Sequence, residues 1–283
     1  MRKFAYLLTL CLASVTSAQE DCNLQYDGNG DGMVNIADVL GLLEEFGTAC
    51  EPAIEDGPCG SESTVSYQGY TYSLVEIEGQ CWFAENLRTE VYANGDSIPA
   101  DLSDSEWLST TSGATAVYGE GTSSCTSNAP DGDACDAEWS LNAYGRLYNW
   151  YAVDDERGLC PNGWHVPTDV EWMTLEIALG MSEAQANETG YRGTDQGAQM
   201  KTESGWVNSG NGSNASGFSG LPCGIRGNNG SFFVAGSYGY WWSSSPQNTY
   251  AWFRNLYTSN ATVYRNSNFN RRGGFSVRCT LDP

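Results

Sequence analysis

The residues best suited to chemistry lie near the start of the chain, between Asp27 and Asp38. This segment reads DGNGDGMVNIAD and matches the twelve-residue EF-hand calcium loop, in which oxygen ligands alternate and a glycine at the sixth position permits the turn. The expected ligands are the side chains of Asp27, Asn29, Asp31, Asn35 and Asp38 and the carbonyl of Met33. The pattern predicts a Ca2+ site, and the alternative is an Asp/Asn/Gly turn without metal.

A short helix is expected directly after this loop, because apolar residues recur at helical spacing over residues 39–46. Asp38 occupies the last ligand position, where common EF-hands carry a bidentate glutamate. In this respect the segment between Cys22 and Cys50 resembles a dockerin, a module that binds cohesin-bearing partners. Type I dockerins carry two such repeats, whereas this chain has a single repeat. The resemblance implies attachment to a cohesin-like scaffold or, for a lone repeat, a calcium-stiffened spacer or pairing unit.

Length and charge restrict the partners of the chain. It has 283 residues and a formal net charge of −22 at pH 7, so its surface repels phosphate and we expect no nucleic-acid partner. Residues 1–18 combine a basic start, an apolar stretch and a small-residue cleavage site, which is the pattern of a signal peptide. Its apolar run of roughly 12 residues is too short to cross a bilayer, and no later segment is suitable. We therefore expect a secreted or cell-surface protein with no membrane span.

Disulfide bonds are expected in the compartment that a signal peptide implies. The chain has ten cysteines, of which Cys11 lies in the predicted signal peptide. Their order along the chain suggests the pairs Cys22–Cys50, Cys59–Cys81, Cys125–Cys135 and Cys160–Cys279, although spacing alone leaves other connectivities open. Cys223 would then be the unpaired thiol. A buried, inert thiol is favoured over a redox or intermolecular role.

The rest of the chain, residues 61–283, is expected to form one α+β domain after a linker at residues 51–60. Short strands are predicted at 64–72, 74–77, 81–83, 116–118, 146–153 and 274–280, because apolar and β-branched residues gather there between turn residues. Few helices, many short strands and long polar loops favour this fold class.

The clearest helix is predicted at residues 169–179. Thr168 can cap its start and Glu171 stands three residues later, which is the pattern of a capping box. Two further short helices are predicted to begin near Asp104 and near Ser182.

Five motifs of the large domain resemble one family. In order they are CWFAENLR at 81–88, YGRLYNWYA at 144–152, CPNGWHVPT at 160–168, WWSSS at 241–245 and GFSVRC at 274–279. They resemble the Fibrobacter succinogenes major paralogous domain of surface and secreted proteins in Bacteroidetes and Fibrobacteres. The resemblance implies a fold akin to C-type lectins and formylglycine-generating enzymes, and a role in attachment and binding. The chain departs from the family by an insertion at 119–138 and by having Cys223 where a glycine is common.

Residues for catalysis are few. His165 is the only histidine, and in its context we expect a structural hydrogen-bonding role. Asp154 and Asp155 could form a carboxylate pair of glycosidase type, but nothing distinguishes them from the many other acidic residues. The chain also lacks the paired late cysteines of the formylglycine-generating relatives and the calcium-and-sugar motifs of C-type lectins. We therefore expect a protein without enzymatic activity.

The candidate ligand-binding surface lies in residues 238–273, which are rich in tyrosine, tryptophan and asparagine. Flat rings with amide and guanidinium donors suit a sugar, and they also form adaptable protein-binding surfaces. A similar segment is the variable binding region of lectin-fold proteins diversified by retroelements. Trp241, Trp242 and Trp252 are expected in the core. The residues expected on an exposed face are Tyr257, Tyr264, Arg265, Asn266, Asn268, Asn270 and Arg271.

Three functions remain open at this point. The favoured one is a binding or adhesion protein for an extracellular glycan or surface protein, joined to a partner by its calcium module. The second is a subunit of an extracellular filament or layer that self-associates. In that case a basic face, with five arginines in residues 251–283, would meet the acidic N-terminal module of the next copy. The third is an enzyme, which rests on fold analogy alone.

Overall fold

Two antiparallel sheets frame the part of the chain that the structure, a computed structural model, describes, namely residues 57–283. Strands outnumber helices, and long loops connect them, so this unit, Gly57–Pro283, has the mixed α and β character that was predicted. The predicted signal peptide, the calcium loop at 27–38 and the predicted Cys22–Cys50 pair lie outside the described residues.

The five-stranded sheet brings the first and last strands of this unit together. Both of its hairpins have two-residue turns with positive φ at each residue, 48° at Gln68 and 82° at Gly69 in the first hairpin. Such turns match the right-handed twist of the strands that they join. The strands in spatial order are β1 (Thr64–Tyr67), β2 (Tyr70–Ile77), β3 (Gln80–Phe83), β13 (Thr280–Leu281) and β6 (Trp164–His165).

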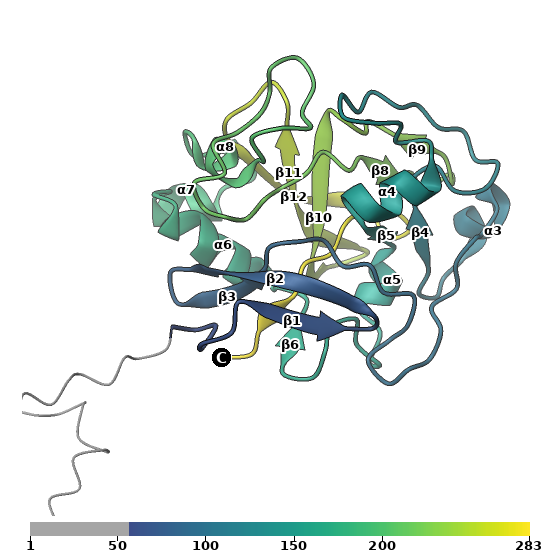
Figure 1. Cartoon of the computed structure of the whole chain (residues 1–283), viewed down its shortest axis with the longest axis horizontal. Helices are drawn as coiled ribbons and strands as arrows, with labels where there is room; N and C mark the ends of the chain where they lie inside the picture. The colour runs from purple at the N-terminus through teal and green to yellow at the C-terminus, as the bar shows by residue number, and fades with distance from the viewer. Residues whose placement is uncertain (1–56) are drawn as a thin grey trace, which may run out of the picture. The chain divides into compact units, whose positions relative to one another are not determined.

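The four-stranded sheet lies at the centre of the unit. Its strands in spatial order are β10 (Tyr238–Gln247), β11 (Tyr250–Tyr257), β12 (Val263–Asn270) and β7 (Gly190–Arg192), all antiparallel. Figure 1 shows β10, β11 and β12 in the middle of the view. Trp241 and Trp242, neighbours on β10, are fully buried in two different core clusters, as expected for side chains that point to opposite faces of a sheet. The predicted core position of both tryptophans is confirmed, whereas Trp252 is only half-buried.

Two small sheets, β4 (Thr115–Val117) with β5 (Arg146–Tyr148) and β8 (Ile225–Arg226) with β9 (Phe232–Phe233), complete the strands. The helices are α3 (Asp104–Ser109), α4 (Ala137–Tyr144), α5 (Trp150–Val153), α6 (Asp169–Ala178), α7 (Glu183–Asn187) and α8 (Gln196–Met200). The predicted capping box of α6 is present, since Glu171 N donates to the Thr168 hydroxyl and Thr168 N donates to Glu171. The predicted starts of α3 and α7 near Asp104 and Ser182 are also confirmed.

Three predicted strands are wrong in part. The segment 64–72 is not one strand, because the turn at Gln68 and Gly69 separates β1 from β2, and β2 continues through the predicted strand 74–77. The segment 146–153 is a strand only as far as Tyr148, because the Asn149 side chain accepts a hydrogen bond from Ala152 N and caps the short helix α5. The segment 274–280 forms isolated bridges to Tyr148, Arg226 and Trp241 before it enters β13. Its backbone partners are divided among several elements, so no continuous ladder forms there.

Three disulfides cross-link the unit, and all three were predicted: Cys59–Cys81, Cys125–Cys135 and Cys160–Cys279. Cys223 is a buried free thiol, as expected. Disulfides form and persist in oxidising compartments, so this unit is extracytoplasmic.

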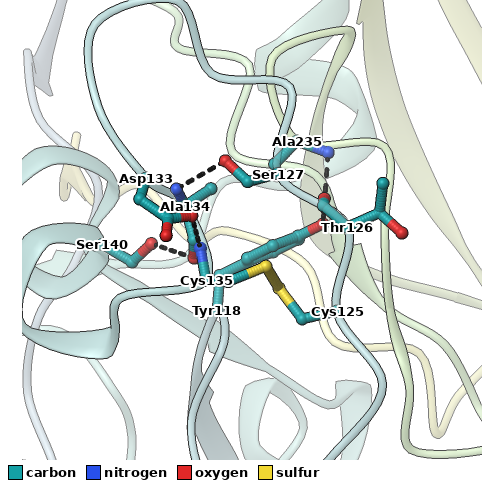
Figure 2. Close-up of a disulfide and its surroundings, with 9 residues drawn as sticks. All are labelled: Tyr118, Cys125, Thr126, Ser127, Asp133, Ala134, Cys135, Ser140 and Ala235. Carbon is teal, nitrogen blue, oxygen red and sulfur yellow. Dashed lines mark hydrogen bonds between the residues drawn. A yellow bond between two sulfur atoms is a disulfide. The ribbon is translucent and has the colours of Figure 1, made fainter.

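The insertion at 119–138 is a cross-linked loop packed on the rest of the domain. Figure 2 shows the Cys125–Cys135 disulfide beside the ring of Tyr118, whose hydroxyl donates to Thr126 O at 2.8 Å. A second contact fixes the far end of the loop, because Ser140 Oγ of α4 donates to Ala134 O at 2.8 Å. These bonds satisfy polar groups that an irregular loop would otherwise leave unpaired.

Candidate ligand-binding face

Strand register gathers five tyrosines on one face of the four-stranded sheet. Residues directly opposite each other in an antiparallel pair point to the same face. Tyr238 is opposite Tyr257, and Tyr240 is opposite Asn255, which in turn is opposite Tyr264. Tyr264 is also opposite Tyr191 of β7. We call this surface the tyrosine face, and it consists of Tyr191, Tyr238, Tyr240, Tyr257 and Tyr264.

The rings of the tyrosine face contact each other in pairs. Tyr238 and Tyr257 are stacked with centroids 4.3 Å apart, and Tyr191 meets Tyr264 edge to face at 4.9 Å. Such pairs fix ring orientation at low entropic cost, since a tyrosine has only two side-chain torsions. Tyr191 is 46% exposed and the other four tyrosines are half-buried. The face therefore offers ordered rings and hydroxyls to solvent.

Two phenylalanines pack against part of the tyrosine face. The ring centroids of Tyr240 and Phe275 are 4.9 Å apart, and Tyr264 lies beside Phe253 with centroids 6.0 Å apart. Both phenylalanines belong to a buried core cluster. Because protein cores are close-packed, these buried rings restrict the motion of the two tyrosines.

A hydrogen bond from Asn266 orients the Tyr264 hydroxyl. Asn266, on the same face, donates from Nδ2 to the Tyr264 hydroxyl at 2.9 Å. Since this bond uses the Tyr264 oxygen as acceptor, its O–H can donate to a ligand. Burial raises the pKa of Tyr238 to about 12, with the neighbouring Tyr191 and Tyr257 hydroxyls adding to the effect. Burial followed by the nearby Tyr264 also raises the pKa of Tyr191. Both phenols are thus neutral donors at physiological pH.

The opposite face of the sheet carries arginines, which are buried against α6. Arg254 lies 2.7 Å from Asp169 and 2.6 Å from Glu176. Arg192 lies 2.7 Å from Glu176, and Arg265 lies 2.6 Å from Asp169. Burial alone would raise the pKa of Asp169, but its bonds to Arg265 and Arg254 hold that pKa below its ordinary value. This network of ion pairs attaches the sheet to α6.

The predicted exposure of Arg265 is therefore wrong. It is 6% exposed, and its guanidinium lies 3.8 Å above the Trp252 ring. The alternation of side chains explains the error, because Tyr264 and Arg265 are neighbours on β12 and must point to opposite faces. Since Tyr264 points to the solvent-accessible face, the side chain of Arg265 must point to the face that packs on α6.

The other residues predicted to bind a ligand lie at different positions on the sheet. Tyr257, Tyr264 and Asn266 lie on the tyrosine face. Asn270 is opposite Tyr250 and so belongs to the other face, and Asn268 is exposed at a register shift of β12. Arg271 donates to Asn248 O at 2.9 Å and lies 4.1 Å above the Trp150 ring, so it braces the β10–β11 hairpin.

The basic C-terminal surface expected from five arginines is also absent from the described part of the chain. Arg254 and Arg278 are 0% exposed, and Arg265 is 6% exposed. Only Arg271 and Arg272 reach solvent, and both are half-buried. Arginine counts in a sequence do not reveal this, because each buried guanidinium has its own carboxylate or carbonyl partners, such as Phe83 O and Phe218 O for Arg278.

Comparison with known families now identifies the domain. The family model of the Fibrobacter succinogenes major domain matches residues 75–280, which include every strand of the tyrosine face. The chain belongs to the Fibrobacter succinogenes major domain family. No curated protein and no solved structure shows significant similarity to it.

Tyr191 is the member of the tyrosine face that lies outside every predicted binding segment, whereas Tyr238 and Tyr240 lie in the predicted segment 238–273 but are not among the residues predicted to be exposed. Tyr191 lies in a three-residue strand of this Fibrobacter succinogenes major domain, and only the pairing of β7 with β12 brings it to the face. Gly190, the first residue of this strand, has a φ of 88°, and a glycine is the residue that adopts this conformation most readily.

His165 of the Fibrobacter succinogenes major domain lies between two carboxylates. Its Nδ1 is 2.7 Å from Asp282 and its Nε2 is 2.8 Å from Glu171. The bond to Glu171, and then the bond to Asp282, raise the pKa of the ring despite its partial burial. These contacts fasten the C-terminal residues to α6, in agreement with the predicted hydrogen-bonding role.

Asp154 and Asp155 line an open depression of the Fibrobacter succinogenes major domain, together with Thr111, Ser112, Gly113, Tyr151, Glu156 and Arg157. Arg157 binds both oxygens of Asp155 at 2.8 Å and lowers the pKa of that carboxyl. A carboxylate held ionised in this way is unsuited to donate a proton.

Within residues 57–283, no group of three or more His, Cys, Asp or Glu side chains is placed to hold a metal ion. The six predicted calcium ligands of the N-terminal loop lie outside this range. In the same range no helix has the length and apolar character needed to cross a bilayer.

Proposed function

We propose that this protein is an extracellular, non-catalytic binding protein whose tyrosine face recognises a glycan. The convergence of five tyrosines from four strands carries the proposal. Sugar rings present C–H faces and hydroxyls, and a surface of ordered aromatic rings with phenol and amide groups is complementary to both. An adhesion role at a cell or polymer surface would follow.

The lectin-like fold implied by the family resemblance is part of this proposal. A mostly β unit with few helices and long loops supports it, as does the placement of the face on strands that rest on a packed core. Binding groups on strands are held more precisely than groups on loops.

The calcium module is proposed to attach or assemble the protein, through a cohesin-like scaffold or through another copy. The spacing of oxygen ligands from Asp27 to Asp38 supports Ca2+ binding. The filament alternative relied on a basic C-terminal surface for self-association, and three of its five arginines are buried. The glycan-binding proposal therefore has the better support.

Replacing Tyr191, the exposed tyrosine of the face, by alanine tests the proposal. The mature chain, residues 19–283, would be applied to a glycan array, and its best ligand would be titrated by calorimetry. We expect Tyr191→Ala to weaken binding roughly tenfold, since an aromatic contact contributes about 0.5–1.5 kcal/mol. The matched control is Tyr250→Ala. Tyr250 on β11 is similarly exposed, at 43%, but its side chain points to the face opposite the tyrosine face.

The two variants separate the outcomes. Equal affinity of Tyr191→Ala and wild type for every glycan would reject the tyrosine face as the site. Binding of a surface protein in place of any glycan, again lost in Tyr191→Ala, would keep the face and replace its ligand class.

A further inference from the structure

The strands of the tyrosine face expose little charge: the charged residues on its four strands are Arg192 on β7, Arg254 on β11 and Arg265 on β12, and all three are buried. β10, β11 and the start of β12 also lie in a part of the chain with few charged residues. Between residues 204 and 264 the only charged residues are Arg226 and Arg254. Both are 0% exposed, and each has a carboxylate partner, Glu120 at 2.9 Å and Asp169 at 2.7 Å respectively. Beyond residue 203 the only acidic residue is Asp282. In a chain with a net charge of −22, these strands expose no charge of their own.

The register of the sheet places the arginines and the tyrosines on opposite faces. Arg254 is opposite Arg265 and Trp241, and Arg192 is opposite Val263, so the arginines share the face that packs on α6. The tyrosines occupy the other face. Arg265 therefore cannot reach a ligand on the tyrosine face without breaking its ion pair with Asp169, which is buried and costly to break.

The groups left to meet a ligand are ring carbons, phenol hydroxyls and the Asn266 amide. A carboxylate or sulfate placed there would lose hydration without gaining a counter-charge. The net negative field of the whole protein would also repel an anionic polymer during approach. A cationic ligand would find ring faces but no carboxylate on these strands, and aromatic rings alone hold a cation weakly at exposed sites.

We infer that the ligand of the tyrosine face is an uncharged glycan. This inference rests on the proposed function and narrows it to neutral sugars, bound by ring contacts and hydroxyl hydrogen bonds. Such binding is insensitive to ionic strength, because no ion pair is screened.

Neutral and anionic polymers test this inference, and two of the pairs share a backbone: hydroxyethylcellulose with carboxymethylcellulose, and dextran with dextran sulfate. The mature protein would be run in native gels containing hydroxyethylcellulose, dextran, mannan, galactan or xylan, and in gels containing carboxymethylcellulose, dextran sulfate or polygalacturonate. We expect retardation by at least one neutral polymer and by none of the anionic ones. Affinity should change less than twofold between 20 and 500 mM NaCl. It should fall roughly tenfold in Tyr191→Ala and stay unchanged in Tyr250→Ala.

The possible failures are distinguishable. Tyrosine-dependent retardation by anionic polymers, weakened by salt, overturns the neutral ligand while glycan recognition stands. Tyrosine-dependent binding of tetramethylammonium, measured by calorimetry, overturns it in favour of a cation. If no glycan gel distinguishes Tyr191→Ala from wild type, the proposed function itself fails. Circular dichroism of each variant shows whether the fold is retained.

Discussion

Arg265 on β12 and Asp169 at the start of α6 form a two-point ion pair, with Nη2 to Oδ2 at 2.6 Å and Nε to Oδ1 at 3.0 Å. The same guanidinium donates to Asn187 O and Glu188 O. One side chain thus joins the sheet to two helices, on the face away from the tyrosines. Its role is to position the sheet.

Removing the Arg265 side chain should destabilise the fold. We expect Arg265→Ala to lower the free energy of unfolding by about 3 kcal/mol, because a buried carboxylate loses one of its two partners. Urea denaturation followed by tryptophan fluorescence measures this. Asn268→Ala, an exposed change on the same strand, is the control and should leave the midpoint unchanged. Equal midpoints for both variants would refute a structural role for Arg265.

The stability of the protein should fall as pH rises above neutrality, through His165. Its folded-state pKa is raised by Glu171 and Asp282, so the charged ring stabilises the fold fully below the unfolded value of about 6.5. This stabilisation is lost as pH rises through the raised folded-state pKa.

Urea midpoints of the wild type and His165→Gln, measured at intervals from pH 5.5 to pH 9, test this dependence. The difference between them should be largest at the acid end and shrink above pH 6.5. Two parallel pH profiles would show that the contacts of His165 with the carboxylates do not depend on its charge.

The Cys223 thiol should be unreactive in the folded protein. Burial raises its pKa to about 12, and the side chain is 1% exposed, so almost no thiolate is available to a reagent. Iodoacetamide at pH 8 should leave the Cys223 peptide unmodified in the native state and modify it fully in urea, as read by mass spectrometry. Native-state labelling within minutes would contradict this burial.

Calcium should bind to the N-terminal loop with one ion per chain. We expect the double variant Asp27→Ala/Asp31→Ala to abolish the calorimetric signal of the mature protein, because it removes two of the charged ligands. The matched control is Asp131→Ala/Asp133→Ala, which changes an Asp-Gly-Asp sequence outside the loop and should leave binding intact. Loss of binding in the control alone would move the site to the insertion.

Local patterns predicted much of this fold because they act over a few residues. The capping box of Thr168 and Glu171 is such a pattern. The three disulfides agree with the pairing that cysteine order suggested, although Cys160 and Cys279 are 119 residues apart. The tyrosine face could be predicted only in part. Which of Tyr264 and Arg265 is exposed depends on strand register, and the contribution of Tyr191 depends on a pairing between segments more than 70 residues apart, β7 and β12. The register between strands that are distant in the sequence cannot be predicted from local composition.

The Cys59–Cys81 bond determines how the unit bears tension. The bond joins a residue ahead of β1 to β3, which is the middle strand of the five-stranded sheet. A pull on the chain ahead of Cys59 therefore passes through sulfur directly into β3, and the β1–β2 hairpin inside the closed loop carries no load. If the protein anchors a cell or a polymer, this covalent shortcut protects the outermost strands of the sheet from being peeled away.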